Sequence, residues 1–534
     1  MIYLVLRFGR QREKGQMKHC NSKGLLTGAL AAIVLAFSAR PAEAAGSCED
    51  VTKVSLPGTT IMLAQNVAAG AYTPPPAPAG RGGRGPNFSD LPAFCRVQAT
   101  LKPSADSDIR MELWMPVAAS WNGKLRGTGN GGLGGGVAVN AGNLGGGVRL
   151  GYATAGNNTG HEGDSKYALD HPEKIKDYGY RAAHEMTVTA KALMKEYYGT
   201  GPKLSYMAEG GGGTMAALSA AQRYPADYDS VAATGMASYL GRHTFGQMWI
   251  WQATHQDEAS FIPVEKYAVL HKAALDACDD KDGLKDGIIG DPEHCRFDPG
   301  VTLCKGAEAA DCLTAPQVEA ARKIYAGPRN PRTGAEVYSP MYPGSELGWG
   351  VLAGGTAPLG IPVEFFKYFV FRDPNWDYKT RPVNFDSDLG LADRPENLPV
   401  NSVDPDLNAF FKRGGKLLLI DGWSDNQVPP KVAIDYYRAV VAKVGAKKAK
   451  ESMRFFMVPG MQHGPGTNGP ENFNFDSLKL LVDWKENGKV PDRLIVSHYK
   501  DGVEVGKRLV CQYPHIATYK GSGNTEDPES YRCK

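Results

Sequence analysis

The sequence predicts an α/β fold built on a mostly parallel sheet. Apolar runs that suit strands alternate with amphipathic stretches that suit helices, which is typical of strand–helix–strand units. In the first half the helical pattern "YRAAHEMTVTAKALMKEYYG" precedes the apolar run "LSYMA". Near the C-terminus the strand "KLLLIDGWSD" precedes the helix "PPKVAIDYYRAVVAKVG". We therefore expect one sheet whose two parts are separated in the sequence by a long segment of another kind.

That separating segment, residues 238–408, lacks the alternation of strands and helices. It carries four of the cysteines, many aromatic residues and turns rich in Gly and Pro. We predict that it forms a lid domain inserted into a core made of residues 45–237 and 409–534. A chain of 534 residues is long enough for such a core with an insertion.

Residues 1–44 have the pattern of an export signal. Lys18 and Lys23 precede the apolar run "LLTGALAAIVLAFSA", and a small-residue cleavage pattern follows at Ala42-Glu43-Ala44. Met17 is an alternative start, because the residues before it fit a signal poorly. The apolar run is short for a membrane anchor, and no other segment looks transmembrane. We therefore expect a periplasmic or secreted protein without a membrane partner after cleavage.

Charge and cysteine content narrow the functional classes further. The formal net charge of +3 is small for this length and gives no indication of nucleic-acid binding. Nine cysteines are present, and Cys20 would leave with the signal. An even remainder in an oxidising compartment favours disulfides over metal thiolates or catalytic thiols. Pairing between sequence neighbours is the simplest connectivity, and other pairings stay open: Cys48/Cys95, Cys278/Cys295, Cys304/Cys312 and Cys511/Cys533.

The stretch "SYMAEGGGGTMAALSAAQRYP", residues 205–225, has the layout in which a hydrolase presents its nucleophile. A short apolar strand leads through a sharp turn into an Ala-rich helix. The turn holds four glycines, Gly210 to Gly213, and no nucleophile. A glycine-rich helix N-terminus also suits a bound anion. The stretch lacks the Lys-Ser/Thr of a phosphate loop and a well-placed acid for a dinucleotide fingerprint, which disfavours nucleotide binding.

Two candidate catalytic residues follow predicted strands of the second half. Asp425 ends the strand in "IDGWSDNQVPP", where it could orient a histidine or cap the next helix. His463 lies in the loop after the strand of "VPGMQHGPG". A glycine-rich turn, then an Asp and then a His after successive strands is the chain order of α/β-hydrolases. We therefore predict an α/β-hydrolase core with Asp425 and His463 as its catalytic pair.

Longer stretches make the chain resemble the tannase and feruloyl esterase family of secreted α/β-hydrolases over nearly all of the mature length. The stretches that carry the resemblance are "GNGGLGG" (129–135), "ATAGNNTGH" (153–161), "YGYRAAHEMT" (178–187), "AAQRYPADYD", "GWSD", "VPGMQHG" and "CQYPHIATYKGSG". Together they are far more specific than any single motif. The resemblance implies a hydrolase core, a large lid and hydrolysis of aromatic or phenolic esters.

The sequence departs from this family at the nucleophile. The family typically reads Gly-Cys-Ser-x-Gly-Gly-Arg, and its serine position falls here on Gly211 and its cysteine position on Gly210. The partner cysteine position after the histidine is Gly464, so both members of that disulfide are missing together. Acyl transfer needs an oxygen or sulfur nucleophile, which glycine lacks. The nucleophile position is therefore expected to be vacant.

The rest of the family's catalytic apparatus has counterparts in this sequence. By resemblance, the oxyanion-hole donors are the N–H of Gly212 and one from the turn of Gly131 and Gly132. Thr214 lies one helical turn beyond the vacant position, where its hydroxyl is expected to point away.

The segment "CDDKDGLKDGII" predicts a calcium site. Side chains of Asp279, Asp282 and Asp286 alternate with the carbonyls of Leu284 and Ile288, and Ca²⁺ prefers such closely spaced hard oxygen ligands. The spacing is not that of an EF-hand, because no Glu stands at the twelfth position. The segment is similar to the family's lid calcium loop, which a neighbouring disulfide closes, here Cys278–Cys295. The alternative is a solvated acidic turn.

Three functions remain open from the sequence. The first is hydrolysis of aromatic esters with an altered mechanism, and the second is a non-hydrolytic lyase or cofactor-free oxygenase reaction with His463 as base. The third is an inactive protein that binds phenolic ligands. Retention of both Asp425 and His463 favours an enzyme. Aromatic residues of the lid could stack on a phenolic ring, although most are expected to be core: Phe245, Trp249, Trp251, Trp349 and Phe365.

Overall fold

The computed structural model describes residues 46–74, 86–133, 135–136, 141–465 and 471–534. Residues 45–534 form one compact unit. The expected export signal and its cleavage site lie outside the described residues. Within the ranges given above, no helix combines the length and the apolar character needed to cross a membrane.

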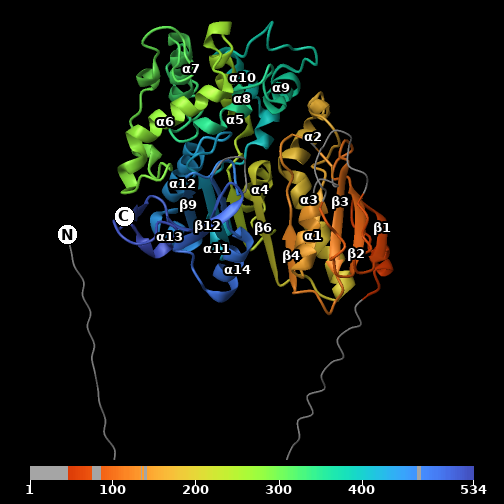
Figure 1. The fold of residues 1–534 in the computed structure, drawn as a ribbon. Helices are drawn as coiled ribbons and strands as arrows, with labels where there is room; N and C mark the ends of the chain where they lie inside the picture. Colours follow the sequence, from red (N-terminus) through yellow and green to blue (C-terminus); the bar gives the residue numbers. More distant parts are fainter. Residues whose placement is uncertain (1–45, 75–85, 134, 137–140, 466–470) are drawn as a thin grey trace, which may run out of the picture. The chain divides into compact units, whose positions relative to one another are not determined.

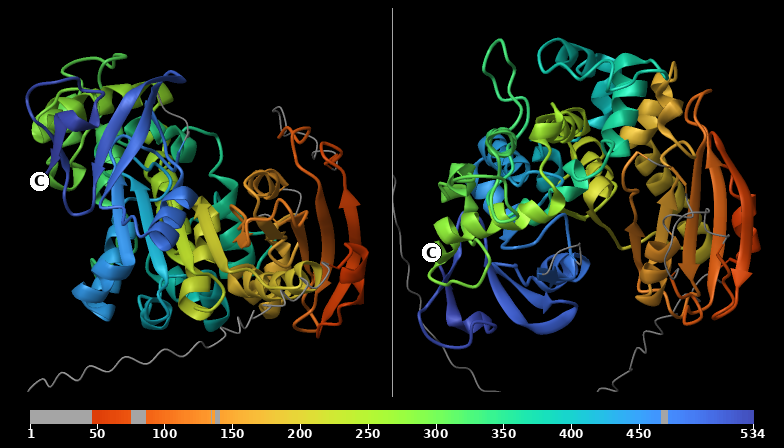
Figure 2. Two further views of the ribbon diagram at one scale, coloured as in Figure 1. Left: turned by 90° about the horizontal axis from the view of Figure 1, so that it is seen from below. Right: turned by 45° about the horizontal axis from the view of Figure 1, so that its top comes forward.

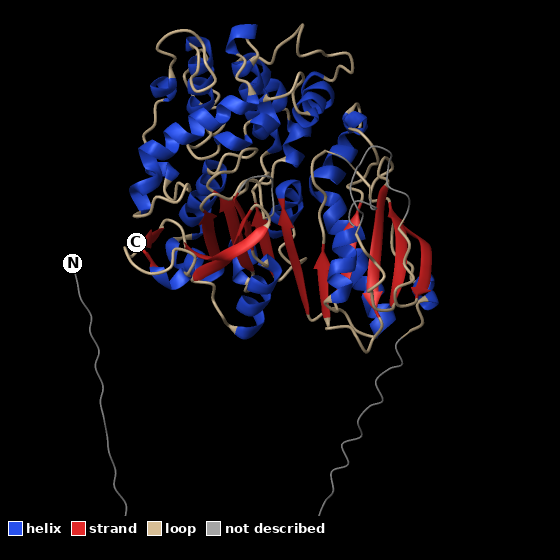
Figure 3. Cartoon of the chain, in the orientation of Figure 1, coloured by secondary structure: helices blue, strands red, loops and turns tan. Residues whose placement is uncertain are grey.

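A nine-stranded sheet forms the centre of the molecule, in the order β1-β2-β3-β5-β4-β6-β7-β8-β9 (Figure 3). Its N-terminal end, β1-β2-β3, is antiparallel, and β3 pairs antiparallel with β5. All neighbours from β5 to β9 pair in parallel, which confirms the predicted α/β fold with a mostly parallel sheet. The strands are β1 (Thr59–Val67), β2 (Phe94–Leu101), β3 (Ile109–Pro116), β4 (Lys124–Gly127), β5 (Ala153–Asn157), β6 (Leu204–Gly210), β7 (Ser230–Thr234), β8 (Lys416–Gly422) and β9 (Met453–Val458).

The parallel strands are buried on both faces, because successive side chains point to opposite sides. Met207, Val231 and Leu417 pack in one cluster with α4 (Thr214–Arg223) and α12 (Lys431–Val444). Their sequence neighbours Tyr206, Ala232 and Leu418 pack in another cluster with α14 (Ser477–Asn487). Figure 2 shows the sheet with helices on its two sides and the N-terminal strands along one edge. Further helices of the core are α1 (Ala141–Arg149), α2 (Pro172–Lys176), α3 (Ala182–Tyr198) and α13 (Ala446–Ser452).

Between β7 and β8 the chain, described throughout this interval, forms helices and no strand. Apart from the last one before β8, these helices gather at one end of the sheet, at the top of Figure 1. Phe245, Phe365 and Trp349 are fully buried there, so three of the candidate pocket aromatics are core residues. The separation into core and lid at residues 238 and 408 stays a prediction. The helices of this interval are α5 (Leu240–Thr254), α6 (Tyr267–Cys278), α7 (Ala315–Ala326), α8 (Gly350–Ala353), α9 (Gly360–Phe365), α10 (Ser387–Ala392) and α11 (Asn408–Lys412).

Four disulfides cross-link the described part of the chain, and each joins cysteines that are neighbours in the sequence. The expected simplest connectivity is therefore confirmed. Cys278–Cys295 closes the acidic loop after α6, and Cys511–Cys533 fastens the C-terminal strands to each other. The remaining pairs are Cys48–Cys95 and Cys304–Cys312. The C-terminal strands form two small sheets: β10 (Glu471–Asn474), β11 (Arg493–Lys500) and β12 (Val503–Cys511) in one, β13 (Ala517–Tyr519) and β14 (Tyr531–Cys533) in the other.

Candidate active site

Asp425 and His463, far apart in the sequence, meet at the ends of β8 and β9. His463 Nδ1 lies 2.9 Å from Asp425 Oδ2. Asp425 is fully buried, and its other oxygen, Oδ1, accepts the backbone N–H groups of Gln427 and Val428, each at 2.8 Å. Of its two predicted roles, Asp425 therefore has the first: it does not cap α12, whose N-terminal cap position is Pro430 and has no side-chain cap hydrogen bond. Asp425 orients the histidine with one oxygen and holds the following turn with the other.

The carboxylates around His463 decide its protonation. Burial of the imidazole lowers its pKa, but the charge of Asp425, their hydrogen bond and the charge of Asp421 outweigh burial. The pKa of His463 is therefore raised above its ordinary value. Gly235, directly after β7, has a φ of +61° and lies against the ring, where a Cβ atom would be 3.4 Å from Nδ1. The chain can pass this closely because glycine has no side chain.

The glycine turn between β6 and α4 faces the free edge of this histidine. Gly211 has a φ of +53°, a conformation that other residues rarely adopt. A Cβ atom on Gly211 would lie 3.1 Å from His463 Nε2, and among the described residues beyond its chain neighbours only atoms of this ring come within 4 Å of it. The backbone is thus shaped like the strained strand-to-helix turn on which α/β-hydrolases carry their nucleophile. The side chain at this position is a hydrogen atom.

The next residue of this turn touches a second glycine turn. A Cβ atom on Gly212 would lie 2.6 Å from the backbone N of Gly132 and 3.0 Å from the Cα of Gly131. The predicted pair of Gly212 and Gly132 is therefore brought together, next to Gly211. The backbones of two separate segments meet beside Gly211.

Side chains from two of the quoted motifs hold the second glycine turn in place. The Tyr178 hydroxyl donates to the carbonyl of Gly132 at 2.8 Å. His161 Nε2 lies 2.9 Å from the carbonyl of Leu133, and Asn130 Nδ2 donates to the carbonyl of Asn157 at 2.8 Å. Tyr178 and His161 are both buried. The motifs that carried the family resemblance thus position backbone groups of the site.

Thr214 does not supply a replacement hydroxyl. Its Oγ1 donates to the carbonyl of Gly211 at 2.6 Å, and the residue is fully buried. The hydroxyl therefore satisfies a backbone acceptor of the turn and points away from His463, as the sequence led us to expect.

Three buried titratable residues near the site were not predicted from the sequence. Glu209, the last side chain before the four glycines, is 9% exposed, and burial raises its pKa to about 7 against the opposing charge of Arg126. Burial and the charge of Asp425 raise the pKa of Asp421 well above its ordinary value. Glu209 and Asp421 both lie near the end of an apolar strand, and an acidic residue at such a place was the sequence pattern that could have indicated them.

His243 of α5 is the third residue, and no local pattern distinguishes it. Its Nε2 lies 3.1 Å from the carbonyl of Gln427, in the turn that Asp425 holds. Burial, together with the charge of His463, lowers the pKa of His243 to about 4, so this ring is neutral at physiological pH. The first lid helix is thereby joined to the loop of the catalytic pair.

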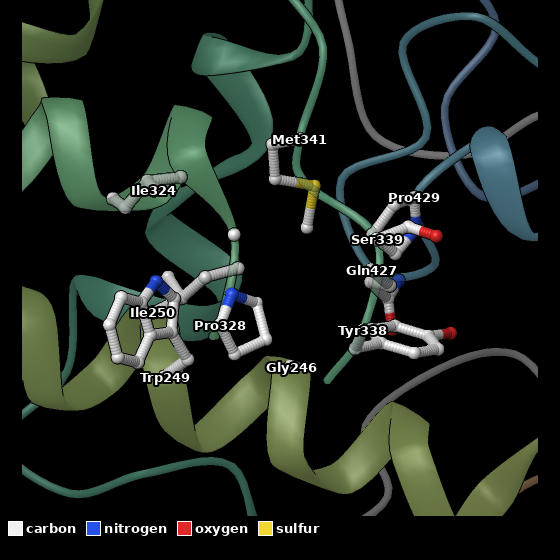
Figure 4. A pocket seen from close by; sticks show the side chains of 11 residues that line it. Gly246, Trp249, Ile250, Ile324, Pro328, Tyr338, Ser339, Met341, Gln427 and Pro429 are labelled. Carbon is white, nitrogen blue, oxygen red and sulfur yellow. The ribbon is translucent and has the colours of Figure 1, made fainter. Parts of the chain in front are cut away.

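A narrow cavity lies between the lid helices and the turn after Asp425 (Figure 4). Trp249, Tyr338, Met341 and Gln427 are among the residues that line it. Its volume is about 10 Å³, which is at the lower limit for one water molecule and far too small for an aromatic acid.

Within the described ranges, which include the predicted calcium loop, no three His, Cys, Asp or Glu side chains form a group that could hold a metal. Asp279 Oδ1 is buried without a hydrogen-bond partner in the described chain. Burial raises the pKa of Asp282 to about 7, and the charges of Asp286 and Asp279 add to this. Asp286 forms an ion pair with Arg508 at 2.7 Å. Lys285 pairs with Asp280 of the same loop at 3.8 Å, so in the described chain Asp279 and Asp282 are the acids of the loop without an ion pair.

The contact between the two glycine turns generates a matched pair of variants. We expect Gly212→Ala to separate the turns, because its methyl group would overlap the backbone of Gly132, and to lower the free energy of unfolding by about 1–3 kcal/mol. Gly210→Ala is the control: its φ is −124°, and its Cβ would be 3.6 Å from the carbonyl oxygen of Thr234. Urea unfolding of both variants measures the difference. Equal stability of the two would contradict the close contact at Gly212.

Comparisons with known proteins agree with this geometry. The family model for tannase and feruloyl esterase matches residues 95–534. An uncharacterized esterase of Xanthomonas campestris pv. campestris is 36% identical over 97% of this chain and 96% of its own length. Feruloyl esterase B of Aspergillus niger is 32% identical over 82% of this chain and 86% of its own. The crystal structure of feruloyl esterase B from Aspergillus oryzae matches with a TM-score of 0.81, at 28% identity, over 91% of this chain and 99% of that one. The chain has an α/β-hydrolase fold and belongs to the tannase and feruloyl esterase family.

Proposed function

We propose that this protein hydrolyses carboxylic esters of aromatic, phenolic acids, and that a water molecule replaces the missing nucleophile. Membership of a family of tannases and feruloyl esterases supports the substrate class. The observation that carries the mechanism is the position at Gly211, which faces the ring of His463 and, in the described part of the chain, no other residue within 4 Å except its chain neighbours. A water molecule at hydrogen-bond distance from His463 Nε2 would occupy the place of a serine hydroxyl.

In this mechanism His463 acts as a general base. Asp425 holds Nδ1, which leaves Nε2 free to take a proton from the water. The water oxygen bonds to the ester carbonyl carbon, and the N–H groups of Gly212 and Gly132 stabilise the oxyanion that forms. Collapse of this intermediate breaks the bond to the alcohol oxygen, which receives the proton from His463. The products are a carboxylic acid and an alcohol.

The second candidate function is ligand binding without turnover. Gly211 favours this function. Catalysis in this fold ordinarily proceeds through a covalent intermediate at that position, and glycine has no side chain that could form one. A non-hydrolytic reaction with His463 as base is the third. The two enzymatic functions need His463, whereas ligand binding alone does not. The loss of activity on replacing His463 therefore distinguishes an enzyme from a binding protein.

The first test restores the hydroxyl. Gly211→Ser should place an oxygen beside His463 Nε2, after the ring gives way by a few tenths of an ångström, and hydrolysis of small activated aryl esters should rise at least 10-fold. The native protein should be slow, should lose a further 10²–10⁴-fold in His463→Ala, and should not react with a serine-directed fluorophosphonate. The variant should be labelled by the fluorophosphonate at residue 211.

Each outcome of this test is decisive. Stoichiometric labelling of the native protein at another residue would show that the turn is not the vacated position. Native protein that hydrolyses no ester but binds phenolic acids would favour the binding function. Thermal unfolding checks that Gly211→Ser is folded, since a side chain at a positive φ costs about 1–3 kcal/mol.

The pH dependence follows from the environment of His463. Only the neutral imidazole can accept a proton, so kcat/KM should fall as the pH falls through the pKa of His463. Because Asp425 and Asp421 raise this pKa, the midpoint should lie above the ordinary value of 6.5. In Asp425→Asn the midpoint should move down, since the charge that raises the pKa is lost. A native midpoint at or below pH 6.5 would contradict His463 as the base.

We also propose that the loop after α6 binds one structural Ca²⁺. The ligands would be the side chains of Asp279, Asp282 and Asp286 and the carbonyls of Leu284 and Ile288. The unpartnered Oδ1 of Asp279 supports this, as does a cavity of about 20 Å³ beside Asp282, Asp286 and Ile288, which is large enough for one ion. The ion would relieve the repulsion that raises the pKa of Asp282.

Chelation tests the calcium proposal. Removing an ion present at 100 times its Kd costs about 2.7 kcal/mol, so excess EGTA should lower the melting temperature and added Ca²⁺ should restore it. Asp282→Asn should lose this response. The control is Asp280→Asn, at an exposed position of the same loop, which should keep it. A native melting temperature unchanged by EGTA would count against the site.

We further propose that the protein is exported, as the sequence of residues 1–44 indicates. The four disulfides support an oxidising compartment, because such bonds rarely persist in a reducing cytosol.

A further inference from the structure

A cleft of about 650 Å³ opens on the lid, between the C-terminal half of α5 and residues 378–385. We call it the lid cleft. This volume is typical of small-molecule sites, which run from about 300 to 1,000 Å³. The lid cleft therefore has room for an aromatic acid, unlike the narrow cavity beside the turn after Asp425.

The lid cleft is distinct from the catalytic pair. Gln252, which lines it, lies nine residues after His243 along α5, which corresponds to about 13 Å of helix. His243 is the residue of this helix that contacts the turn after Asp425. Trp249 lines both the lid cleft and the narrow cavity, so its side chain stands between them.

Aromatic faces form much of the wall. Trp251 stacks on His255 with ring centroids 3.4 Å apart, and Tyr378 meets Trp251 edge-on at 6.2 Å. Trp249 and Phe385 form a second edge-on pair at 5.0 Å. These contacts fix the rings before any ligand arrives, so an aromatic ligand would stack on them with little loss of side-chain freedom.

The lining carries positive charge and no acidic residue. Lys323 and Lys379 both line the lid cleft. Lys323 Nζ donates to Gln256 Oε1 at 2.7 Å, and Lys379 Nζ lies 5.9 Å from the centroid of the Tyr378 ring. Among the described residues, no carboxylate lies within ion-pair distance of either ammonium, although hydrogen bonding and, more weakly, the charge of Lys323 lower the pKa of Asp257. Burial lowers the pKa of His255, so this ring adds no charge near neutral pH.

One buried acceptor in the lining is also unused. Gln252 Nε2 donates to the carbonyl of Val383 at 3.3 Å, but its Oε1 is buried and has no hydrogen-bond partner in the described part of the chain. An amide oxygen in this state costs free energy that a ligand hydroxyl could recover. A suitable ligand would thus have an aromatic ring, a negative charge and a hydroxyl donor.

We propose that the lid cleft is an accessory binding site for a small phenolic carboxylate, with its ring on the aromatic wall, its carboxylate at Lys323 and Lys379 and its hydroxyl on Gln252 Oε1. The site binds this ligand without transforming it. The proposal follows from the lining of the cleft and does not depend on ester hydrolysis at His463.

Isothermal titration with 4-hydroxybenzoate tests the site. The variant Lys323→Ala/Lys379→Ala should bind at least 5-fold more weakly than the native protein, and Lys305→Ala, which changes an exposed lid lysine outside the cleft, should bind as the native protein does. His463→Ala should retain this binding, which separates the lid cleft from the catalytic site. Neutral 4-hydroxybenzamide should bind more weakly than the carboxylate, and Gln252→Leu should remove the preference for 4-hydroxybenzoate over benzoate.

Several results would overturn the proposal. They are no binding of 4-hydroxybenzoate at 10 mM by the native protein, unchanged affinity in the double lysine variant, or binding that disappears in His463→Ala. Equal affinity for the amide and the carboxylate would overturn the role of the lysines. Melting temperatures of all variants verify that the protein is folded. Lys379 is exposed, and Lys323 is half-buried with an exposed hydrogen bond to Gln256, so replacing both should change the melting temperature little.

Discussion

The site depends on the buried carboxylate of Asp425, whose two oxygens accept hydrogen bonds from different segments. Asp425 Oδ1 accepts two backbone N–H groups of its own turn, and Oδ2 holds His463. A buried charged group is tolerated only when it is paired and hydrogen-bonded. Asp425 meets this condition because backbone N–H groups of its own turn and the imidazole of His463 both contact it. The end of β8, the turn after it and the loop after β9 are therefore fixed together. His243 extends this unit to the lid through the carbonyl of Gln427.

Backbone contacts between glycines form the rest of the site. Gly211 presents a hydrogen atom to His463, Gly212 packs on the turn of Gly131 and Gly132, and Gly235 lets the chain pass the imidazole. Tyr178 fixes the second turn from the side. Each of these close contacts restricts the residues that can stand at these positions, because a Cβ atom would meet a neighbouring backbone or ring atom.

The lid adds features that the catalytic pair does not use. Its core is built from fully buried aromatic residues such as Phe245, Phe365 and Trp349, whereas Trp249 and Trp251 line the lid cleft. The same helix, α5, therefore carries three kinds of side chain: core rings, a neutral histidine at the catalytic turn, and an aromatic wall open to small molecules. Electrostatics differ accordingly, with acidic groups gathered around His463 and ammonium groups at the lid cleft.

The sequence by itself determined the α/β class and the Asp425–His463 pair, and it offered pairing between neighbouring cysteines as the simplest connectivity. These follow from local periodicity, chain order and spacing. Only the tertiary structure decided that Gly211 faces His463 Nε2, that Gly212 touches Gly132, that Thr214 turns away, and which lid aromatics are core. It also brought Glu209, Asp421 and His243 to the site and opened the lid cleft. The physical reason is that proximity between strand ends and helix faces depends on how the elements pack, and packing joins residues whose sequence separation carries no periodic signal.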